Sequence, residues 1–440
     1  MESTARRMIS RRRFLGHALR ALAGPPAGAL AVNLAHAPAL AGGPQAGDRT
    51  MPRAAHPSRQ PDPDPPGTVR LFLCGDVMTG RGIDQILPDP GRPGLHEPWV
   101  RSALDYVALA EAATGRIRRP VGFDYIWGDA LAELEARRPD ARIVNLETAV
   151  TTADEPWPGK GIHYRMHPAN LPCLMAAGID CCVLANNHVL DWGRPGLLET
   201  LDTLRAAGIA TAGAGRDGTG ASAPAVIDLP GGGRVLVFAL ALASSGVPDD
   251  WAAQAGRPGV HLVRDLSSAA VAALARRLRA ARRPGDIVVA SIHWGGNWGY
   301  ALPAEHRSLA HALVDEGGVD LVHGHSSHHP LGIEVYRQRL ILYGCGDFLN
   351  DYEGIAGYEK YRPDLTLMYL PVLDAGTGRL EGLDLVPMQI RHLRVNRASA
   401  GEAAWLAERL SREGIAQAGD GGAWVEAGPD GNLRLRWHRG

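Results

Sequence analysis

Seven short apolar runs, most of them rich in Val, Ile and Leu, constrain the fold of this chain more than any other feature. Between several of them lie segments with apolar residues at helical spacing, such as GLLETLDTLRAAGI and SSAAVAALARRLRAARRPGD. Strands that alternate with helices of this kind form βαβ units, in which helices cover a sheet. The sequence therefore predicts an α/β fold. The runs are TVRLFLCG, ARIVNLETAV, DCCVLANNH, GRVLVFALAL, GDIVVASIHWGG, VDLVHGHSSHH and LILYGCGDFL.

The balance of charge excludes two classes of partner. The 440 residues include 46 Lys and Arg and 47 Asp and Glu, which leaves a net charge of −1. A chain so balanced predicts no bulk attraction to nucleic acid or to an anionic membrane surface. The five cysteines form no Cys-x-x-Cys pair, and Cys74 and Cys345 each end an apolar run. We interpret the cysteines as small core residues rather than a disulfide framework or a structural zinc site.

The N-terminal region has the layout of an export signal. The stretch SRRRFLG precedes a weakly apolar segment that contains Pro25 and Pro26 and is too interrupted to span a bilayer. Paired arginines before such a segment predict a twin-arginine signal peptide over 1–41, export to the periplasm or another extracytoplasmic space, and membrane contact only through that peptide. A basic tail is the alternative. Residues 42–67 read as a Pro-rich linker, 68–391 as the main folded domain and 392–440 as a C-terminal appendage.

Polar side chains follow nearly every apolar run. In open α/β sheets the functional site lies at the carboxyl ends of the strands, so we expect these side chains to meet. Carboxylate, amide and imidazole ligands together are typical of a site for Mn, Fe or Zn. The residues at the run ends are Asp76, Asn145, Glu147, Asn186, Asn187, His188, His293, His323, His325, His328, His329 and Asp347.

Five motifs carry a resemblance to a known family. In order they are CGDVMTGRGID, IVNLETAVT, VLANNHVLDWG, SIHWGGNW and HGHSSHHPLGIEVYRQRLILYGCGDFLN. They resemble the CapA family, which is linked to poly-gamma-glutamate capsule synthesis and is built like the calcineurin-type metallophosphoesterases. The resemblance covers about residues 68–390. It implies a single main domain with a four-layer α/β/β/α sandwich and one or two divalent metal ions (Mn, Fe or Zn) at the strand ends.

The resemblance also implies roles for individual residues. His188 would sit near the leaving group of a phosphate ester as a general acid or oxyanion stabiliser. Glu147 would bridge two metal ions. Arg81, just past the first loop, is a reasonable clamp for an anionic substrate. The metal ligands implied by the matching motifs are Asp76, Glu147, Asn187, His293, His325 and His328.

The sequence departs from the pattern of the superfamily at several positions. Met78 stands where metallophosphoesterases usually have a histidine, so one metal position is predicted to lose an imidazole. Asn297 and Asp347 replace the Glu and Asn that the CapA pattern tends to show. The stretch GDFLNDYEG adds Asp347, Asp351 and Glu353 near the proposed mouth, which would favour a substrate with a cationic or amine group.

Several residues have competing local interpretations. Asn186, Asn187 and Asp191 are placed to cap the following helix, although we assign metal ligation to Asn187. Gly324 would permit a tight bend between His323 and His325, and His323 and His329 are interpreted as supporting or surface residues.

Three functional hypotheses remain open at this point. The first is an exported metal-dependent hydrolase or transferase that acts on an anionic polymer or phosphoester, with an envelope polymer-synthesis complex as a candidate partner. The second is a non-catalytic polymer-binding or assembly protein with a degenerate metal site. A 5′-nucleotidase, the third, lacks the expected Asp-x-His start.

Overall fold

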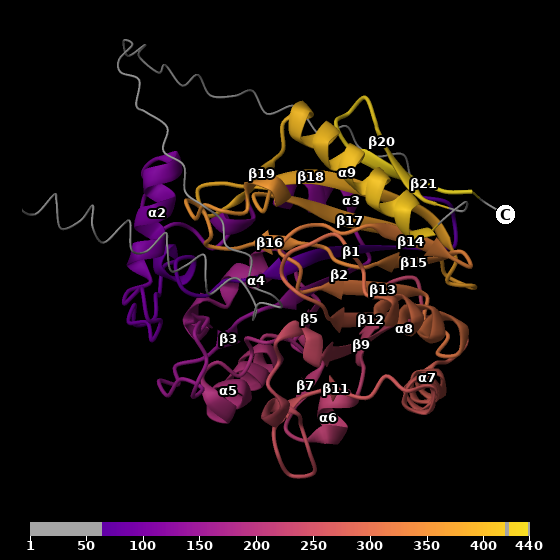
Figure 1. Ribbon diagram of the computed structural model, residues 1–440, viewed down its shortest axis with the longest axis horizontal. Helices are drawn as coiled ribbons and strands as arrows, with labels where there is room; N and C mark the ends of the chain where they lie inside the picture. The colour runs from indigo at the N-terminus through magenta and orange to yellow at the C-terminus, as the bar shows by residue number, and fades with distance from the viewer. Residues whose placement is uncertain (1–63, 419–421, 439–440) are drawn as a thin grey trace, which may run out of the picture.

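The computed structural model describes residues 64–418 and 422–438, so the predicted signal peptide and nearly all of the predicted linker lie outside the described residues. Two mixed β-sheets, of ten and seven strands, form the centre of the molecule (Figure 1). In the described part of the chain no helix is long and apolar enough to cross a membrane. All five cysteines are buried and unpaired, which confirms their interpretation as core residues.

The first sheet has β1 near its middle, with parallel β2 on one side and antiparallel β17 on the other. One of its edge strands comes from the C-terminal region and the other from the middle of the chain. In spatial order its strands are β20 (Trp424–Ala427), β21 (Leu433–Arg436), β18 (Leu380–Ile390), β17 (Leu365–Asp374), β1 (Thr68–Val77), β2 (Ala141–Leu146), β5 (Cys181–Val183) and β6 (Ala210–Ala212), with β16 (Asp347–Leu349) beside β1 and β19 (Val395–Arg397) beside β18.

The second sheet is parallel in its central part, where β12 lies between β9 and β13. In spatial order its strands are β11 (Leu262–Val263), β9 (Arg234–Leu242), β12 (Asp286–His293), β13 (Leu321–His325), β15 (Arg339–Leu342) and β14 (Ile333–Tyr336), with β8 (Ala225–Asp228) beside β9. Two short pairs stand apart: β3 (Ala149–Val150) with β4 (Arg165–Met166), and β7 (Ala214–Gly215) with β10 (Gly259–Val260).

Alternation along β9 explains how the sheets stack. Val235 and Val237 belong to the large core that the two sheets share, whereas Leu236 and Phe238 pack with the leucines of α7 (Ser268–Ala281) and α8 (Ala304–Asp315). Successive strand residues face opposite sides, so an uninterrupted apolar run fills both faces of a buried strand. On the far side of the first sheet, α3 (Ala130–Arg137) and α9 (Ala400–Ala418) pack through the large core (Figure 1).

These layers make the domain a four-layer α/β/β/α sandwich, as expected from the resemblance. The remaining helices are α2 (Leu104–Thr114), α4 (Pro172–Ala176), α5 (Gly193–Ala206) and α6 (Gly218–Ser222).

The predicted boundary at residue 392 has no counterpart in the sheet topology. Strand β19 pairs with β18, and β21 pairs with β18 and β20. The described part of the C-terminal region therefore extends the first sheet, and α9 covers it. The polar composition of this region gave no sign of strands that belong to the sheet, because a strand at the edge of a sheet needs only one apolar face.

His261 gives the fold a predicted sensitivity to acid. Its Nδ1–H donates to the carbonyl oxygen of Ala239 at 3.0 Å, and burial, which outweighs this bond, lowers the pKa of His261 to about 4. An unfolded histidine takes up a proton near pH 6.5, so the stability that His261 contributes is complete above that pH and is lost as the pH falls toward 4. We expect His261→Gln to reduce the acid-induced loss of stability between these values by at most about 3 kcal/mol. Urea unfolding at pH 7 and pH 4.5 measures this difference, and an unchanged pH dependence would contradict it.

Candidate metal centre

The first sheet supplies carboxylates and amides at one of its ends. Asp76 is the penultimate residue of β1, and its Cα is in register with Asn145 of β2 and with Asp347 of β16. Glu147 follows β2 directly, and Asn145 Nδ2 donates to Asp76 Oδ1 at 2.8 Å and to Glu147 Oε2 at 3.2 Å. Parallel pairing on both sides of β1 thus brings three carboxylates from distant segments to one edge.

Close backbone packing makes this edge possible. A Cβ atom on Gly75 would lie 1.7 Å from the carbonyl oxygen of Gly346, so only glycine lets β1 approach the segment that leads into β16. Asp76 N–H then donates to the same carbonyl oxygen at 2.9 Å.

The second sheet supplies imidazoles. His293 and His325 are the last residues of β12 and β13, they are paired in register, and their Nδ1 atoms lie 2.8 Å apart. His328 follows β13, and its Nδ1 lies 2.8 Å from Asp347 Oδ1 of the first sheet. The two sheets therefore contribute different kinds of donor to the same place.

All six predicted metal ligands meet here. His325 Nδ1 lies 3.9 Å from Asp76 Oδ1, and His293 Nε2 lies 3.9 Å from Glu147 Oε1 and 3.2 Å from Asn187 Oδ1. Two donor groups, each with atoms within 4.8 Å of one another, share Asp76. The first group is Asp76, His293 and His325, and the second is Asp76, His328 and Asp347.

Asp347 is the ligand candidate that the residue assignment from sequence left out. In the sequence it is one of the residues at the run ends and a departure from the CapA pattern, but it was not assigned as a ligand. Its place at the end of the last apolar run was the signal that could have led to that assignment. The second group has three donors without an imidazole from position 78, because Asp347 joins Asp76 and His328 there. Met78 Sδ instead accepts a hydrogen bond of 3.5 Å from the hydroxyl of Tyr352.

Electrostatics shows that these residues fit a cation. Burial, together with the charge of Asp347, raises the pKa of Asp76 to about 7, and burial beside Asp76 raises the pKa of Glu147 well above its usual range. Within residues 64–418 and 422–438 neither carboxylate forms an ion pair with Lys or Arg. Burial also lowers the pKa of His293 and of His325 well below its usual range.

His328 shows the opposite shift. Burial alone would lower the pKa of His328, but the charge and hydrogen bond of Asp347 outweigh burial and raise it. A divalent cation would supply the positive charge that the buried carboxylates of this centre lack, and it would prefer neutral imidazoles as ligands.

Buried amides hold the donors in place. Asn186 Oδ1 accepts the backbone N–H groups of His188 and Val189, so it stabilises the turn as expected, and its Nδ2 donates to Asn145 Oδ1 at 3.0 Å. Asn350 Nδ2 donates to Asp347 Oδ2 at 2.7 Å. Supports of this kind fix the orientation of metal ligands.

His188 lies at the edge of the donor cluster, with Nε2 3.9 Å from Glu147 Oε1. Its Nδ1 lies 2.6 Å from Asp191 Oδ2, and burial lowers the pKa of His188 to about 4 against the influence of Asp191. Asp191 was expected to cap the helix that follows. That expectation was wrong, because its carboxylate is used by His188, by Lys160 and by the backbone N–H of Tyr164.

The structure places Arg81 in a buried ion cluster of its own. The guanidinium donates to Asp351, to Glu97 at 2.9 Å and to the hydroxyl of Tyr106 at 2.8 Å, and the residue is 3% exposed. The guanidinium that was predicted to bind an anionic substrate is thus already paired with two carboxylates of the protein itself.

The prediction of an acidic mouth was wrong for Asp351 and Glu353. Asp351 is buried against Arg81, and Glu353 accepts the backbone N–H groups of His392 and Leu393 at 3.0 Å each. Both carboxylates have structural partners, so neither forms an acidic mouth that would attract a cationic substrate.

His323 and His329 stay outside the donor groups, as expected. His323 Nε2 donates to the carbonyl oxygen of Cys74 at 2.8 Å and links the two sheets, while His329 Nε2 accepts the N–H of Gly299 at 3.1 Å. The expectation for Gly324 was wrong. It lies within β13, where a Cβ would meet the carbonyl oxygen of Tyr343 at 2.4 Å, so glycine serves close strand packing there.

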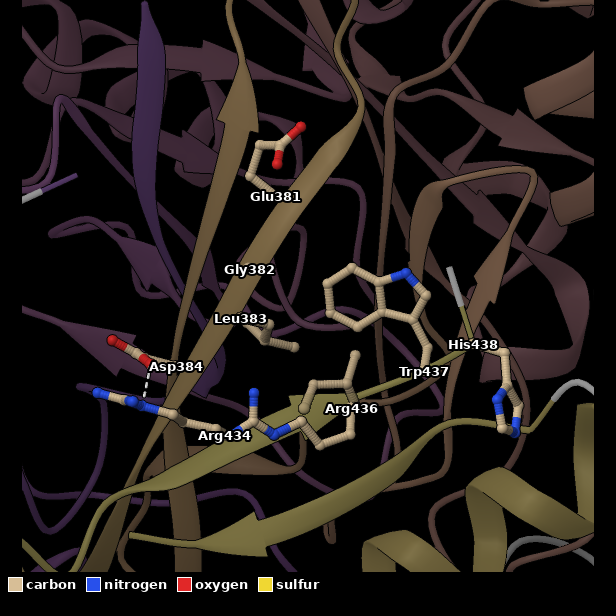
Figure 2. Close-up of a pocket in the computed structure, with 9 residues that line it drawn as sticks. Glu381, Gly382, Leu383, Asp384, Arg434, Arg436, Trp437 and His438 are labelled. Atoms are coloured by element: carbon tan, nitrogen blue, oxygen red, sulfur yellow. Dashed lines mark ion pairs between the residues drawn. The ribbon is translucent and has the colours of Figure 1, made fainter. Parts of the chain in front are cut away.

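A cavity of about 360 Å³ lies away from the candidate metal centre (Figure 2). It borders β18 and β21, and Arg434 pairs with Asp384 at 3.4 Å on one side of it. None of the predicted site residues lines it.

The fold and the centre define a class of protein. This is a four-layer α/β/β/α protein whose two sheets bring carboxylates, amides and imidazoles to one buried place suited to divalent cations. The chain belongs to the family of the bacterial capsule synthesis protein PGA_cap, whose model matches residues 70–352. The resemblance to CapA is thereby confirmed.

Relatives with curated names support the same family. A probable polyglutamine synthesis accessory protein of Mycobacterium tuberculosis is 48% identical over 351 residues, which cover 79% of this chain and 92% of the relative. The capsule biosynthesis protein CapA of Bacillus anthracis is 27% identical, covering 73% and 68%. The PGA biosynthesis protein CapA of Bacillus subtilis is 26% identical, covering 70% and 69%. A phosphatase structure from Mycoplasma pneumoniae is similar with a TM-score of 0.41 at 11% identity, covering 73% and 94%.

Proposed function

We propose that this protein is a metal-dependent hydrolase or transferase that acts on an anionic substrate during the synthesis or processing of poly-gamma-glutamate or another envelope polymer. The observation that carries the proposal is the convergence of the two donor groups on Asp76. The relatives named for capsule biosynthesis, PGA biosynthesis and polyglutamine synthesis supply the biological context. The substrate would be a phosphoester or an amide of a gamma-linked glutamyl polymer.

The donor set names the residues that would hold the metal. Asp76, His293 and His325 would hold one ion, with Glu147 and Asn187 beside them, and Asp76, His328 and Asp347 would hold a second. Mn, Fe or Zn suits this mixture of oxygen and nitrogen donors. When bound, the metal supplies Lewis-acid activation of the reacting oxygen atoms.

His188 is proposed to move the proton. The carboxylate of Asp191 can only accept, so the neutral ring of His188 carries its proton on Nδ1 and presents the lone pair of Nε2 on the side of Glu147. His188 therefore first accepts a proton from the attacking hydroxyl group at Nε2 and then returns it to the leaving group.

Removal of the His188 imidazole tests this role. We expect purified protein to contain stoichiometric Mn, Fe or Zn and to cleave an aryl phosphodiester, and His188→Ala to lower kcat about 100-fold or more while the metal content stays the same. Elemental analysis and steady-state kinetics measure these quantities. His438→Ala, at an exposed position outside the centre, is the control and should behave as wild type. Unchanged turnover in His188→Ala would refute the role.

A non-catalytic polymer-binding or assembly protein is the second candidate. It is favoured by Met78, which stands where metallophosphoesterases usually have a histidine, and by the ion pairs of Arg81 with carboxylates. Stoichiometric metal without turnover of any ester or amide would support this candidate. Protein that binds no metal would exclude the hydrolase.

We further propose that the protein works outside the cytoplasm. The support is the stretch SRRRFLG ahead of a weakly apolar segment, which is the pattern of a twin-arginine signal. Export in the folded state would allow metal uptake before transport.

A further inference from the structure

The chain uses lysine at only two positions. Of its 46 Lys and Arg residues, only Lys160 and Lys360 are lysines. Lys160 lies in the segment between β3 and β4, and its side chain is 15% exposed. Lys360 is exposed at the surface, where its ammonium group lies 4.7 Å from the ring centroid of Tyr361. A largely buried lysine in a chain that almost always uses arginine calls for a physical explanation.

The ammonium group of Lys160 lies behind the turn that carries two residues of the metal centre. Its Nζ donates to the backbone carbonyl of Asn187 and to Asp191 Oδ1, and it lies 3.3 Å from His188 Nδ1. On its other side the ammonium lies 4.8 Å from the ring centroid of Trp251. The donors of Lys160 thus contact the turn itself and the carboxylate that orients His188.

The segment around Lys160 is hydrogen-bonded to Asp191 on both sides of the lysine. Trp157 N–H donates to the carbonyl oxygen of Asp191 at 2.7 Å, and Tyr164 N–H donates to Asp191 Oδ2 at 2.7 Å. These bonds fix both ends of the short loop that presents Lys160. The loop and the turn are therefore held as one unit around Asp191.

We propose that Lys160 is a positioning residue, which acts on substrate and metal only through the turn Asn187–His188. By holding the Asn187 carbonyl it sets the direction of the Asn187 side chain toward His293, where Asn187 Oδ1 lies 3.2 Å from Nε2. By occupying Asp191 Oδ1 it leaves Oδ2 for the Nδ1–H of His188, so that Nε2 faces Glu147.

The chemistry of lysine explains why arginine is absent here. Two acceptors and the face of an aromatic ring surround one point, which suits a compact ammonium with three hydrogens in tetrahedral directions. The planar fork of a guanidinium directs its donors into one plane and needs more space. Two of the three hydrogens of the Lys160 ammonium group are thus used by Asn187 and Asp191.

The test compares Lys160→Met with the matched control Lys360→Met and with Lys160→Arg. In metal-free protein labelled with 15N-histidine, we expect wild type and Lys360→Met to show His188 as a single tautomer protonated at Nδ1, assigned by its loss in His188→Gln. Lys160→Met and Lys160→Arg should both show a mixture of tautomers. Mn²⁺ titration should give a dissociation constant about tenfold higher in both Lys160 variants, the loss typical of an outer support.

Two results would overturn the proposal. One is an unchanged His188 spectrum and unchanged Mn²⁺ affinity in Lys160→Met. The other, which needs no folded variant, is reductive methylation of Lys160 as fast as Lys360 in native wild-type protein. The inference rests on the proposed function for its consequences, but the tautomer is measured without metal or substrate. A protein that fails to turn over any substrate would therefore refute the hydrolase and leave the positioning role standing.

Discussion

Asp76→Asn is expected to lower the affinity for Mn²⁺ by more than about 100-fold, beyond the loss that removal of an outer support causes. The reason is that Asp76 belongs to both donor groups, so its loss removes a charged ligand from each. Its carboxylate is fully buried and accepts a hydrogen bond of 2.8 Å from Asn145 Nδ2, so the substitution also disturbs the residue that holds Asp76 in place. Isothermal titration with Mn²⁺ measures the affinity, and circular dichroism checks the fold.

Asp347→Asn provides the matched comparison. Asp347 belongs to the second donor group only, so we expect this variant to retain one high-affinity ion and to lose or weaken the other. Asparagine is also the residue that the CapA pattern tends to show at this place. Equal losses in the two variants would contradict the assignment of Asp76 as the shared ligand.

Gly75→Ala is expected to destabilise the protein by more than about 4 kcal/mol, or to prevent folding. The added Cβ would lie 1.7 Å from the carbonyl oxygen of Gly346 and 2.9 Å from that of Cys345, and backbone atoms cannot rotate away as a flexible side chain can. Separation of β1 from β16 would also move Asp76 away from Asp347. Urea denaturation and soluble yield measure the effect.

The control for this substitution is Gly231→Ala. A Cβ at Gly231 meets no atom within 4 Å, and its backbone φ is not in the left-handed region. We therefore expect a change within about 0.5 kcal/mol of wild type. Similar stabilities of the two alanine variants would show that β1 and β16 are not packed as closely as the structure indicates.

The sequence predicted much of the site because strand ends are visible in it. The run TVRLFLCGD ends at Asp76 and the run IVVASIH ends at His293, and the rule that parallel strands share a functional end placed them together. Asp347 was missed as a ligand because the family pattern has a different residue there. Its role depends on parallel pairing of β16 with β1, which no local pattern reveals.

The partners of charged side chains were the least predictable feature. Arg81, Asp351 and Glu353 lie in polar loops whose composition suits a substrate-binding mouth equally well. Only the folded chain shows that Arg81 pairs with Asp351, 270 residues away, and that Glu353 holds a backbone turn. Burial makes such pairing necessary, because a charged group that loses its hydration in the interior without a partner costs on the order of several kcal/mol of stability.

What the sequence alone determined is the α/β class, the order of the seven apolar runs and the residue types at their ends, since these follow from local periodicity and from short motifs. Tertiary structure alone decided which donors share Asp76, how the C-terminal strands extend the first sheet, and that Lys160 reaches the turn of His188. The physical reason is that periodicity reports which face of an element is buried, whereas the distance between two side chains depends on how whole sheets stack and on which strands pair.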